Sequence, residues 1–308
     1  FIHLNLITDS SLKFFLSKYL ILSMIVSVNI YAQKMDSLIA YKTGLCLNYF
    51  NVDEFLKIFE SRNYTKEQII TFASNMAWHG NDKYGNELAK KCIAKNDSIT
   101  AGNWHAYSVQ NTKNGNYSEA IYGLENSLAI APQEMEGYYG WVLLYYYRDY
   151  QRALLHLNHY DSHTPNAVDA PVGENIHFLK GLCYYQLNQY EKSIEEFNIN
   201  ATFELKSFGK KNVNAYIYFY IARNYEKLNN LKLAETYYKK AIKTAQFPVE
   251  ANYYLGMMYK YKKDNRTKAM THFLYAYHFL QDGYKQQDIY VELFDEVYLS
   301  QIDEEFEY

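Results

Sequence analysis

Proline and glycine are scarce in this chain, with 4 Pro and 13 Gly among 308 residues. This composition excludes a collagen-like or low-complexity chain, and an aromatic content of 18% excludes an intrinsically disordered one. The charges nearly cancel, because 31 Lys and Arg face 34 Asp and Glu for a formal net charge of -3. The chain therefore lacks the positive charge on which non-specific nucleic-acid binding depends, and we expect no nucleic-acid partner.

Cysteine is also rare, and the familiar catalytic motifs are missing from the sequence. Cys46, Cys92 and Cys183 are odd in number and form no CxxC pair, so they indicate neither a disulfide framework nor a structural zinc site. We expect them to be small buried hydrophobic residues. No HExxH, GxSxG, GxxxxGK or GxGxxG motif occurs. Zincins, hydrolases with a nucleophile elbow, P-loop proteins and dinucleotide-binding proteins therefore lack their usual motifs here, and we expect no cofactor.

One apolar run stands out near the beginning of the chain. Residues 1–11 show no period, and we interpret them as upstream translation that is not native. Residues 12–32 have only two lysines as charges, then a 12-residue apolar run from Tyr19 to Ile30, then Ala32. This pattern predicts a signal peptide cleaved after Ala32, and therefore an exported protein, periplasmic or extracellular. An uncleaved N-terminal anchor is the alternative. We expect no membrane span in the mature chain.

Small and aromatic residues recur at regular spacing from Trp104 onward. Small residues that mark the start of a second helix are 33, 40, 41 and 35 residues apart, at Ala120, Ala153, Ser193, Ala234 and Ala269. The clearest unit contains Leu255, Gly256, Tyr259, Ala269, Phe273 and Ala276. This spacing resembles the tetratricopeptide repeat (TPR), a helix-turn-helix unit of about 34 residues. Small residues fit the family because two antiparallel helices must approach closely where they cross.

The resemblance implies an all-α fold, a right-handed α-solenoid of helical hairpins that ends in a C-terminal capping helix. An N-terminal helical hairpin is expected over 33–65, and an acidic capping helix and tail over 283–308, with Ile289–Leu299 as an amphipathic helix. Irregular inserts are expected at Asp161–Asn175 and Thr202–Asn214. The repeats, spanning 66–281, are expected at about 66–100, 101–134, 134–167, 174–207, 215–248 and 249–282.

Tyrosine is abundant, with 35 residues, and the resemblance suggests where it acts. In TPR proteins the first helix of each pair lines a concave groove, and tyrosine offers large contact area for an extended peptide or a sugar chain. The alternative for each ring is packing between repeats. The predicted groove consists of Tyr138, Val142, Tyr145, Phe178, Leu182, Tyr185, Phe219, Arg223 and Tyr253.

Histidines form the one cluster of metal-ligand types. His156 and His159 are three residues apart, which places them on one helix face, with Asp161 and His163 just beyond. The end of a second helix is commonly polar and solvated, so we predict no metal site and retain His156, His159 and His163 as weak candidates.

The TPR resemblance implies a non-enzymatic protein-protein interaction scaffold or adaptor with a protein or peptide partner. The predicted signal peptide assigns this scaffold to the cell envelope. Two other functions stay open. One is a carbohydrate-binding or glycoside-cleaving helical toroid, whose candidate acids are Asp169, Glu174, Glu195 and Glu196. The other is the periplasmic sensory domain of a signalling system.

Overall fold

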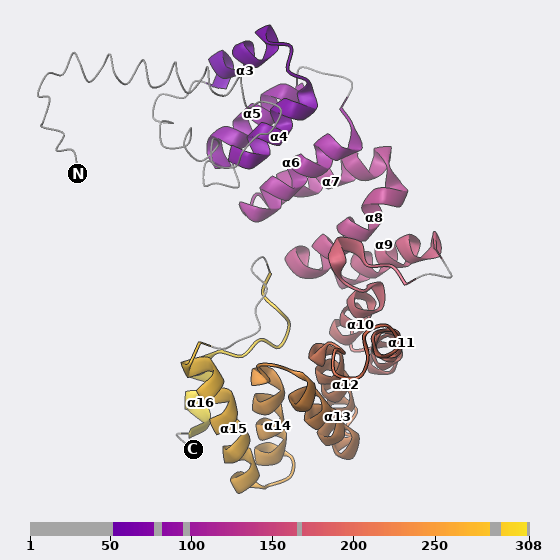
Figure 1. The fold of residues 1–308 in the computed structure, drawn as a ribbon, viewed down its shortest axis with the longest axis vertical. Coiled ribbons are helices and arrows are strands. Elements are labelled where there is room, and N and C mark those ends of the chain that lie inside the picture. Colours follow the sequence, from indigo (N-terminus) through magenta and orange to yellow (C-terminus); the bar gives the residue numbers. More distant parts are fainter. Residues whose placement is uncertain (1–51, 77–81, 95–98, 165–167, 284–290, 307–308) are drawn as a thin grey trace, which may run out of the picture. The chain divides into compact units, whose positions relative to one another are not determined.

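The computed structural model describes residues 52–76, 82–94, 99–164, 168–283 and 291–306 (Figure 1). The expected signal peptide, Cys46 and most of the expected 33–65 hairpin lie outside these ranges. The described residues form helices joined by turns and loops and contain no strand, which confirms the all-α prediction. The chain divides into two compact units, Phe1–Ile130 and Ala131–Tyr308, which we call unit 1 and unit 2.

In unit 1, residues between Val52 and Tyr107 form one apolar core that includes Leu56, Phe72 and Leu88. Thr65 begins a helix through a capping box, because its hydroxyl accepts from the Gln68 amide at 3.3 Å and its amide donates to Gln68 Oε1 at 2.9 Å. The helices are α3 (Val52–Ser61), α4 (Lys66–Met76), α5 (Asp82–Ala94), α6 (Ala101–Lys113) and α7 (Tyr117–Ile130).

Unit 2 continues the pattern with four helical hairpins and a terminal helix (Figure 1). Its helices are α8 (Pro132–Val142), α9 (Tyr150–Ser162), α10 (Ile176–Gln186), α11 (Tyr190–Phe208), α12 (Ala215–Lys227), α13 (Leu231–Thr244), α14 (Val249–Tyr261), α15 (Arg266–Gln281) and α16 (Leu299–Phe306). A π-helical turn, Leu143–Tyr147, extends α8, and a short 3-10 turn, Pro171–Gly173, precedes α10.

Small residues allow the paired helices to touch. A Cβ atom on Gly256 would lie 2.6 Å from Phe273, and one on Gly181 would lie 2.9 Å from Phe197. Ser193 is fully buried, and its hydroxyl donates to the Gly181 carbonyl at 2.8 Å, which fastens α11 to α10. The side chains that began the repeat pattern in the sequence are therefore contact points between helices.

Two local expectations were wrong. The insert expected at Thr202–Asn214 is helical as far as Phe208, because no helix breaker occurs before Gly209, which ends α11 at φ 81°. The amphipathic helix expected over Ile289–Leu299 is not formed in its described part: residues 291–298 are irregular, and Asp295 has φ 57°.

The C-terminal capping helix is present, but it lies later than its pattern suggested. α16 packs on α15 with Ile302 fully buried, and Lys260 of α14 pairs with Glu305 at 2.9 Å. Within the described ranges, none of the helices has the length and apolar character to cross a bilayer. Cys92 and Cys183 are buried, as predicted.

Candidate functional site

The predicted groove residues lie on the first helices of the hairpins in unit 2, α8, α10, α12 and α14, together with the π-helical turn. We call this surface the first-helix face. Seven of the nine predicted residues are buried: Val142, Tyr145, Leu182, Tyr185, Phe219, Arg223 and Tyr253. Tyr138 and Phe178 are half-buried. The face is therefore largely covered, and the cover decides what the site can do.

Part of the cover is the chain's own segment Glu292–Val297, which we call the returning segment. Its Phe294 ring stacks on Tyr145 with centroids 5.7 Å apart, and Arg148 holds its guanidinium 4.3 Å from the centroid of the same ring. Phe294 is 8% exposed and Val297 is fully buried. Residues more than 100 positions apart in the sequence thus form one contact surface.

Main-chain atoms of the returning segment are also bound. Tyr220 donates its hydroxyl to the Phe294 carbonyl at 2.6 Å, and Arg148 Nη2 donates to the Glu292 carbonyl at 3.2 Å. Such bonds recognise a backbone without regard to its side chains. The π-helical turn that carries Tyr145 ends at Arg148, whose φ of 55° turns the chain into α9.

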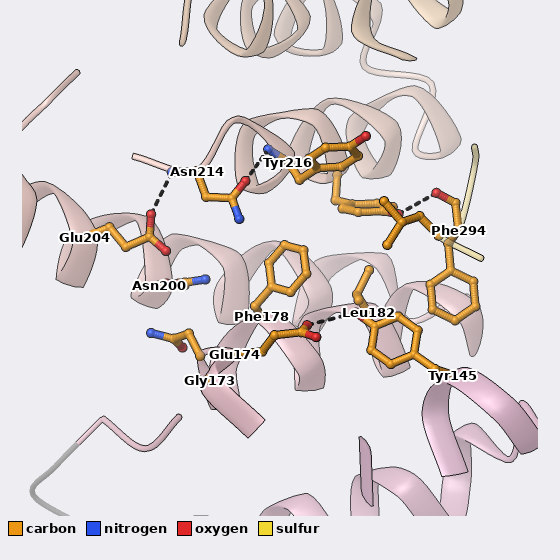
Figure 2. Close-up of a pocket in the computed structure, with 13 residues that line it drawn as sticks. Tyr145, Gly173, Glu174, Phe178, Leu182, Asn200, Glu204, Asn214, Tyr216 and Phe294 are labelled. Atoms are coloured by element: carbon orange, nitrogen blue, oxygen red, sulfur yellow. Dashed lines mark hydrogen bonds between the residues drawn. The ribbon is translucent and has the colours of Figure 1, made fainter. Parts of the chain in front are cut away.

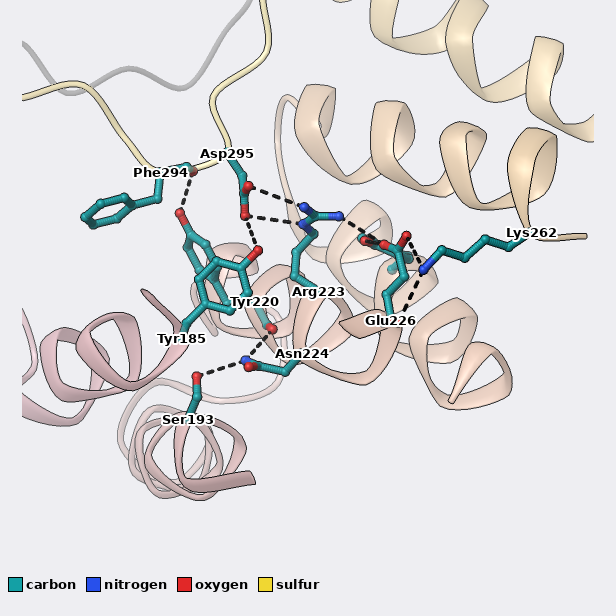
Figure 3. Close-up of polar contacts among 10 residues, drawn as sticks. Tyr185, Ser193, Tyr220, Arg223, Asn224, Glu226, Lys262, Phe294 and Asp295 are labelled. Atoms are coloured by element: carbon teal, nitrogen blue, oxygen red, sulfur yellow. Dashed lines mark hydrogen bonds and ion pairs between the residues drawn. The ribbon is translucent and has the colours of Figure 1, made fainter. Parts of the chain in front are cut away.

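A buried ionic network fixes the side chain of Asp295 (Figure 3). Its carboxylate accepts from the Tyr185 hydroxyl at 2.8 Å and from Arg223 Nε at 3.2 Å. Arg223 also pairs with Glu226 at 3.0 Å, and Glu226 accepts from the Tyr238 hydroxyl at 2.6 Å. Arg223 is 8% exposed, so its charge depends on these partners in place of water.

The pKa shifts in this network keep Arg223 charged and the tyrosine hydroxyls protonated. Burial by itself lowers the pKa of Arg223, but Tyr238 and Asp295 raise it well above its usual value. Burial raises the pKa of Tyr185 and Tyr220 further above neutral pH, so both hydroxyls are protonated donors there. The face therefore offers a fixed cation and two hydroxyl donors to a carboxylate and a main-chain carbonyl.

A cavity of about 260 Å³ lies beside the returning segment (Figure 2). Glu174 accepts here from Tyr145 at 3.0 Å, and Glu204 accepts from the Asn214 amide at 2.7 Å. Burial raises the pKa of Glu204. Among the described residues, the Oδ1 atom of Asn200 has no hydrogen-bond partner, although the residue is 1% exposed. The polar lining thus includes several acceptors, which suits a ligand that carries donors.

Helix caps position the walls of this cavity. Asn175 caps α10 by accepting from the His177 amide at 2.9 Å, and Asn214 caps α12 by accepting from the Tyr216 amide at 3.0 Å. The cavity is lined by Tyr145, Gly173, Glu174, Asn175, Phe178, Leu182, Asn200, Glu204, Asn214, Tyr216, Tyr220, Leu293 and Phe294.

The predicted groove residues divide into groups. Tyr145, Tyr185 and Arg223 contact the returning segment, while Phe178 and Leu182 line the cavity. The others make contacts among the helices of unit 2. Phe219 packs on Tyr254 at 5.7 Å, Tyr253 packs on Phe273 at 5.8 Å, Tyr138 stacks on Trp141 at 5.9 Å, and Val142 is fully buried.

Sequence reasoning missed Tyr216 and Tyr220, yet the spacing contained a signal for them. On α10 the site residues are Phe178, Leu182 and Tyr185, spaced i, i+4 and i+7. The same spacing read back from Arg223 gives Tyr220 and Tyr216 on α12, where the groove prediction placed Phe219. Tyr216 and Tyr220 lie three residues before the predicted Phe219 and Arg223, which is about one helical turn, so the stripe on α12 begins one turn earlier than the repeat spacing indicates.

The histidines near the end of α9 separate into different contacts. His159 Nδ1 and His163 Nε2 lie 3.1 and 3.3 Å from the two oxygens of Glu136. His156 packs on the Tyr139 ring with centroids 4.6 Å apart, and burial lowers its pKa. Asp161 pairs with Lys180 at 2.8 Å. In the part of the chain that the structure describes, no group of three His, Cys, Asp or Glu side chains has a geometry suited to a metal ion.

The acids considered for glycoside cleavage are also dispersed. Glu196 lies 2.6 Å from His177 and 3.3 Å from Lys180, Glu195 is exposed, and Asp169 accepts from Thr164. Glu174 faces the cavity and accepts from Trp141 at 2.9 Å.

Comparison with known proteins identifies the fold. No protein-family model and no curated protein matches the sequence. Among solved structures, the chain is similar to the C-terminal part of a TPR repeat-containing protein from Cytophaga hutchinsonii, with 17% identity and a TM-score of 0.53 over 80% of this chain and 96% of that one. It is also similar to PilW, described as a widely conserved type IV pilus biogenesis factor, with 14% identity and a TM-score of 0.51 over 71% of this chain and 96% of that one. These similarities confirm the predicted fold class, an α-solenoid of TPR-like helical hairpins.

Proposed function

We propose that this protein is a non-enzymatic interaction scaffold of the cell envelope, which binds a segment of a partner protein on the first-helix face of unit 2. The TPR-like fold supports this proposal, because stacked hairpins present extended surfaces suited to binding. The pattern of residues 12–32 supports export, and PilW, a protein of similar fold, is described as a pilus biogenesis factor.

One observation carries the proposal: the first-helix face already holds an irregular peptide segment. The face stacks a tyrosine on one aromatic ring of the segment, pairs an arginine with one of its carboxylates and donates hydrogen bonds to two of its main-chain carbonyls. These are the contacts by which a groove recognises an extended peptide. A partner segment of similar length would find the same donors and rings in place.

Site-specific photocrosslinking in the source cells tests the proposal. A photoreactive phenylalanine analogue replaces Tyr138 or Phe178 on the face, or Leu155 or Ile199 on second helices as matched controls, since the last two are 50% and 46% exposed. We expect one protein to crosslink at both face positions and at neither control, and to bind the purified chain directly. Crosslinking at the control positions, or at none of the four, would contradict the proposal.

The cavity favours a glycan as the alternative ligand. Aromatic rings beside carboxylates, here Tyr145 and Tyr216 beside Glu174 and Glu204, are the groups that contact sugar rings and hydroxyls. Binding of the purified chain to a glycan array, combined with no crosslinked protein, would support the carbohydrate function.

A further inference from the structure

The residues that bind the returning segment also contact one another, so their arrangement does not depend on the segment. Arg223 keeps its ion pair with Glu226 at 3.0 Å inside α12, and Glu226 is held by Tyr238 of α13 and by Lys262, 3.4 Å away. The Arg223 guanidinium also lies 3.8 Å from the centroid of the Tyr254 ring. Removal of Asp295 therefore leaves the cation paired, and the binding face is preorganised by helices α12 to α14.

The segment itself has the form of a peptide ligand. Asp295 has φ 57°, a left-handed turn that Asp tolerates better than most residues. The turn directs the Phe294 carbonyl to Tyr220 and the Asp295 carboxylate to Arg223 (Figure 3). The Phe294 ring lies against Tyr145. Two adjacent residues thus make the specific contacts, while Glu292 is bound by its carbonyl.

We propose that the returning segment is an intramolecular ligand of the first-helix face, and that the partner displaces it with a segment of the same chemistry, an aromatic residue followed directly by an acidic one in a turn. The displacement by a partner rests on the proposed function. The assignment of the returning segment as an intramolecular ligand rests on the contacts in the structure alone. A tethered ligand has an effective concentration on the order of millimolar, so its presence raises the concentration of partner needed for binding.

The test uses the full chain and a fluorescein-labelled peptide of residues 291–298, VELFDEVY. Fluorescence polarisation measures its affinity for the wild-type protein and for Phe294→Ala/Asp295→Ala. We expect at least about tenfold tighter binding to the double variant, because its own segment no longer competes. Circular dichroism and thermal melting verify that the variant is folded. If the double variant does not fold, Asp295→Asn alone serves, with the same direction and a smaller ratio.

Peptide variants establish which residues are recognised. Replacing Phe294 by Ala or Asp295 by Asn in the peptide is expected to weaken binding by at least about tenfold. Replacing Glu292 by Gln is the matched control and leaves the affinity unchanged, because the face binds the carbonyl of that residue. No binding to a folded variant, equal binding to wild type and variant, or equal affinity of all peptides would overturn the inference.

A second copy of the chain is the other candidate occupant. A concentration-dependent dimer of the wild type, lost in Phe294→Ala/Asp295→Ala, would assign the segment to the partner copy and overturn the intramolecular assignment. The crosslinked protein completes the test: it must bind the double variant at least about tenfold more tightly and compete with the labelled peptide. A crosslinked protein that does not compete overturns this inference and leaves the proposed function intact. If the peptide binds but no protein crosslinks, the result contradicts the proposed function and the displacement by a partner, and it supports only the intramolecular ligand.

Discussion

Helices α6 of unit 1 and α12 of unit 2 are both first helices of hairpins, and both bury several polar residues. In α6 these are uncharged: Asn103, Ser108, Gln110, Asn111 and Thr112. In α12 they include Arg223 and Glu226, which pair with each other. Within the described residues, Ser108 Oγ, Gln110 Oε1 and Asn111 Oδ1 have no hydrogen-bond partner.

The difference shows what each helix requires of its surroundings. Neutral amides and hydroxyls tolerate imperfect bonding at a modest cost, about 1 to 3 kcal/mol for a buried unsatisfied group. A buried charge without a partner is far more costly, and Arg223 is accordingly paired with carboxylates in fixed places, first with Glu226 of α12 itself. Asp295 of the returning segment is one of them. Helix α12 is thus specific for an anionic group, whereas α6 has no such requirement.

The largest expected effect is a difference between α6 and α12 in the free energy of unfolding that is lost when a buried polar residue is replaced. Glu226→Ala removes a carboxylate that contacts Arg223, Tyr238 and Lys262, and we expect a loss of about 3 to 5 kcal/mol in the free energy of unfolding. Gln110→Met in α6 removes a 2.8 Å bond and leaves the buried Asn86 oxygen without its donor, which is expected to cost about 1 to 3 kcal/mol. Urea unfolding followed by circular dichroism measures both. Equal costs would remove the distinction between the helices.

The next test compares a glycine at a helix crossing in unit 2 with a glycine away from any crossing in unit 1. Gly256→Leu is expected to destabilise the chain by about 1 to 3 kcal/mol, because its Cβ would lie 2.6 Å from Phe273. Gly102→Leu in α6 is the matched control: the nearest atom to its Cβ would be Thr100 Oγ1 at 3.7 Å, and we expect no loss of stability. Thermal unfolding compares the two. A control variant that melts as early as Gly256→Leu would show that leucine in a helix is the cause and not the crossing.

The smallest expected effect concerns pH. Burial raises the pKa of Glu235, but hydrogen bonds from Lys239, Lys263 and Tyr259 outweigh it and lower the pKa to about 2. A carboxyl whose pKa is lower in the folded than in the unfolded protein stabilises the fold at any pH above the unfolded-state pKa. This stabilisation is lost as the pH falls toward the folded-state pKa of about 2. The contribution is about 1 kcal/mol after screening by solvent. Glu235→Gln removes this slope from the acid unfolding curve.

Glu119 of unit 1 provides the control for that slope. Its pKa is also lowered, by hydrogen bonds from Lys90 and Tyr107, but its side chain is 39% exposed. Glu119→Gln is therefore expected to change the curve less than Glu235→Gln. A larger change at Glu119 would contradict the assignment of the stronger carboxylate contacts to unit 2.

The fold was predictable because close helix crossings leave small residues at repeating positions. Gly256 and Gly181 appear in the sequence pattern and also in the structure as contacts with Phe273 and Phe197. Three residues that contact the returning segment were predictable because the resemblance assigns the first helices to a groove. They are Tyr185 and Arg223 on first helices and Tyr145 in the π-helical turn that extends one. Local spacing carries this information.

The returning segment was not predictable from spacing. Leu293, Phe294 and Val297 are arranged as on an amphipathic helix, so the local pattern indicated a cap. Contacts with Tyr145 and Tyr185 outweigh that helical preference. The sequence around Asp295 contains no sign that it contacts Tyr185, which lies 110 positions earlier. Helix propensity is a weak determinant when long-range contacts compete with it.

The position of Phe294 and Asp295 in the sequence also sets an order of events during synthesis. The ribosome completes α8 to α15 before it adds the residues that cover Tyr145 and Arg223. Hairpins of this kind need only their neighbours to fold, so the face is assembled while it is still uncovered. A nascent chain therefore passes through an interval in which the face is open to other molecules, and the arrival of Phe294 and Asp295 ends that interval.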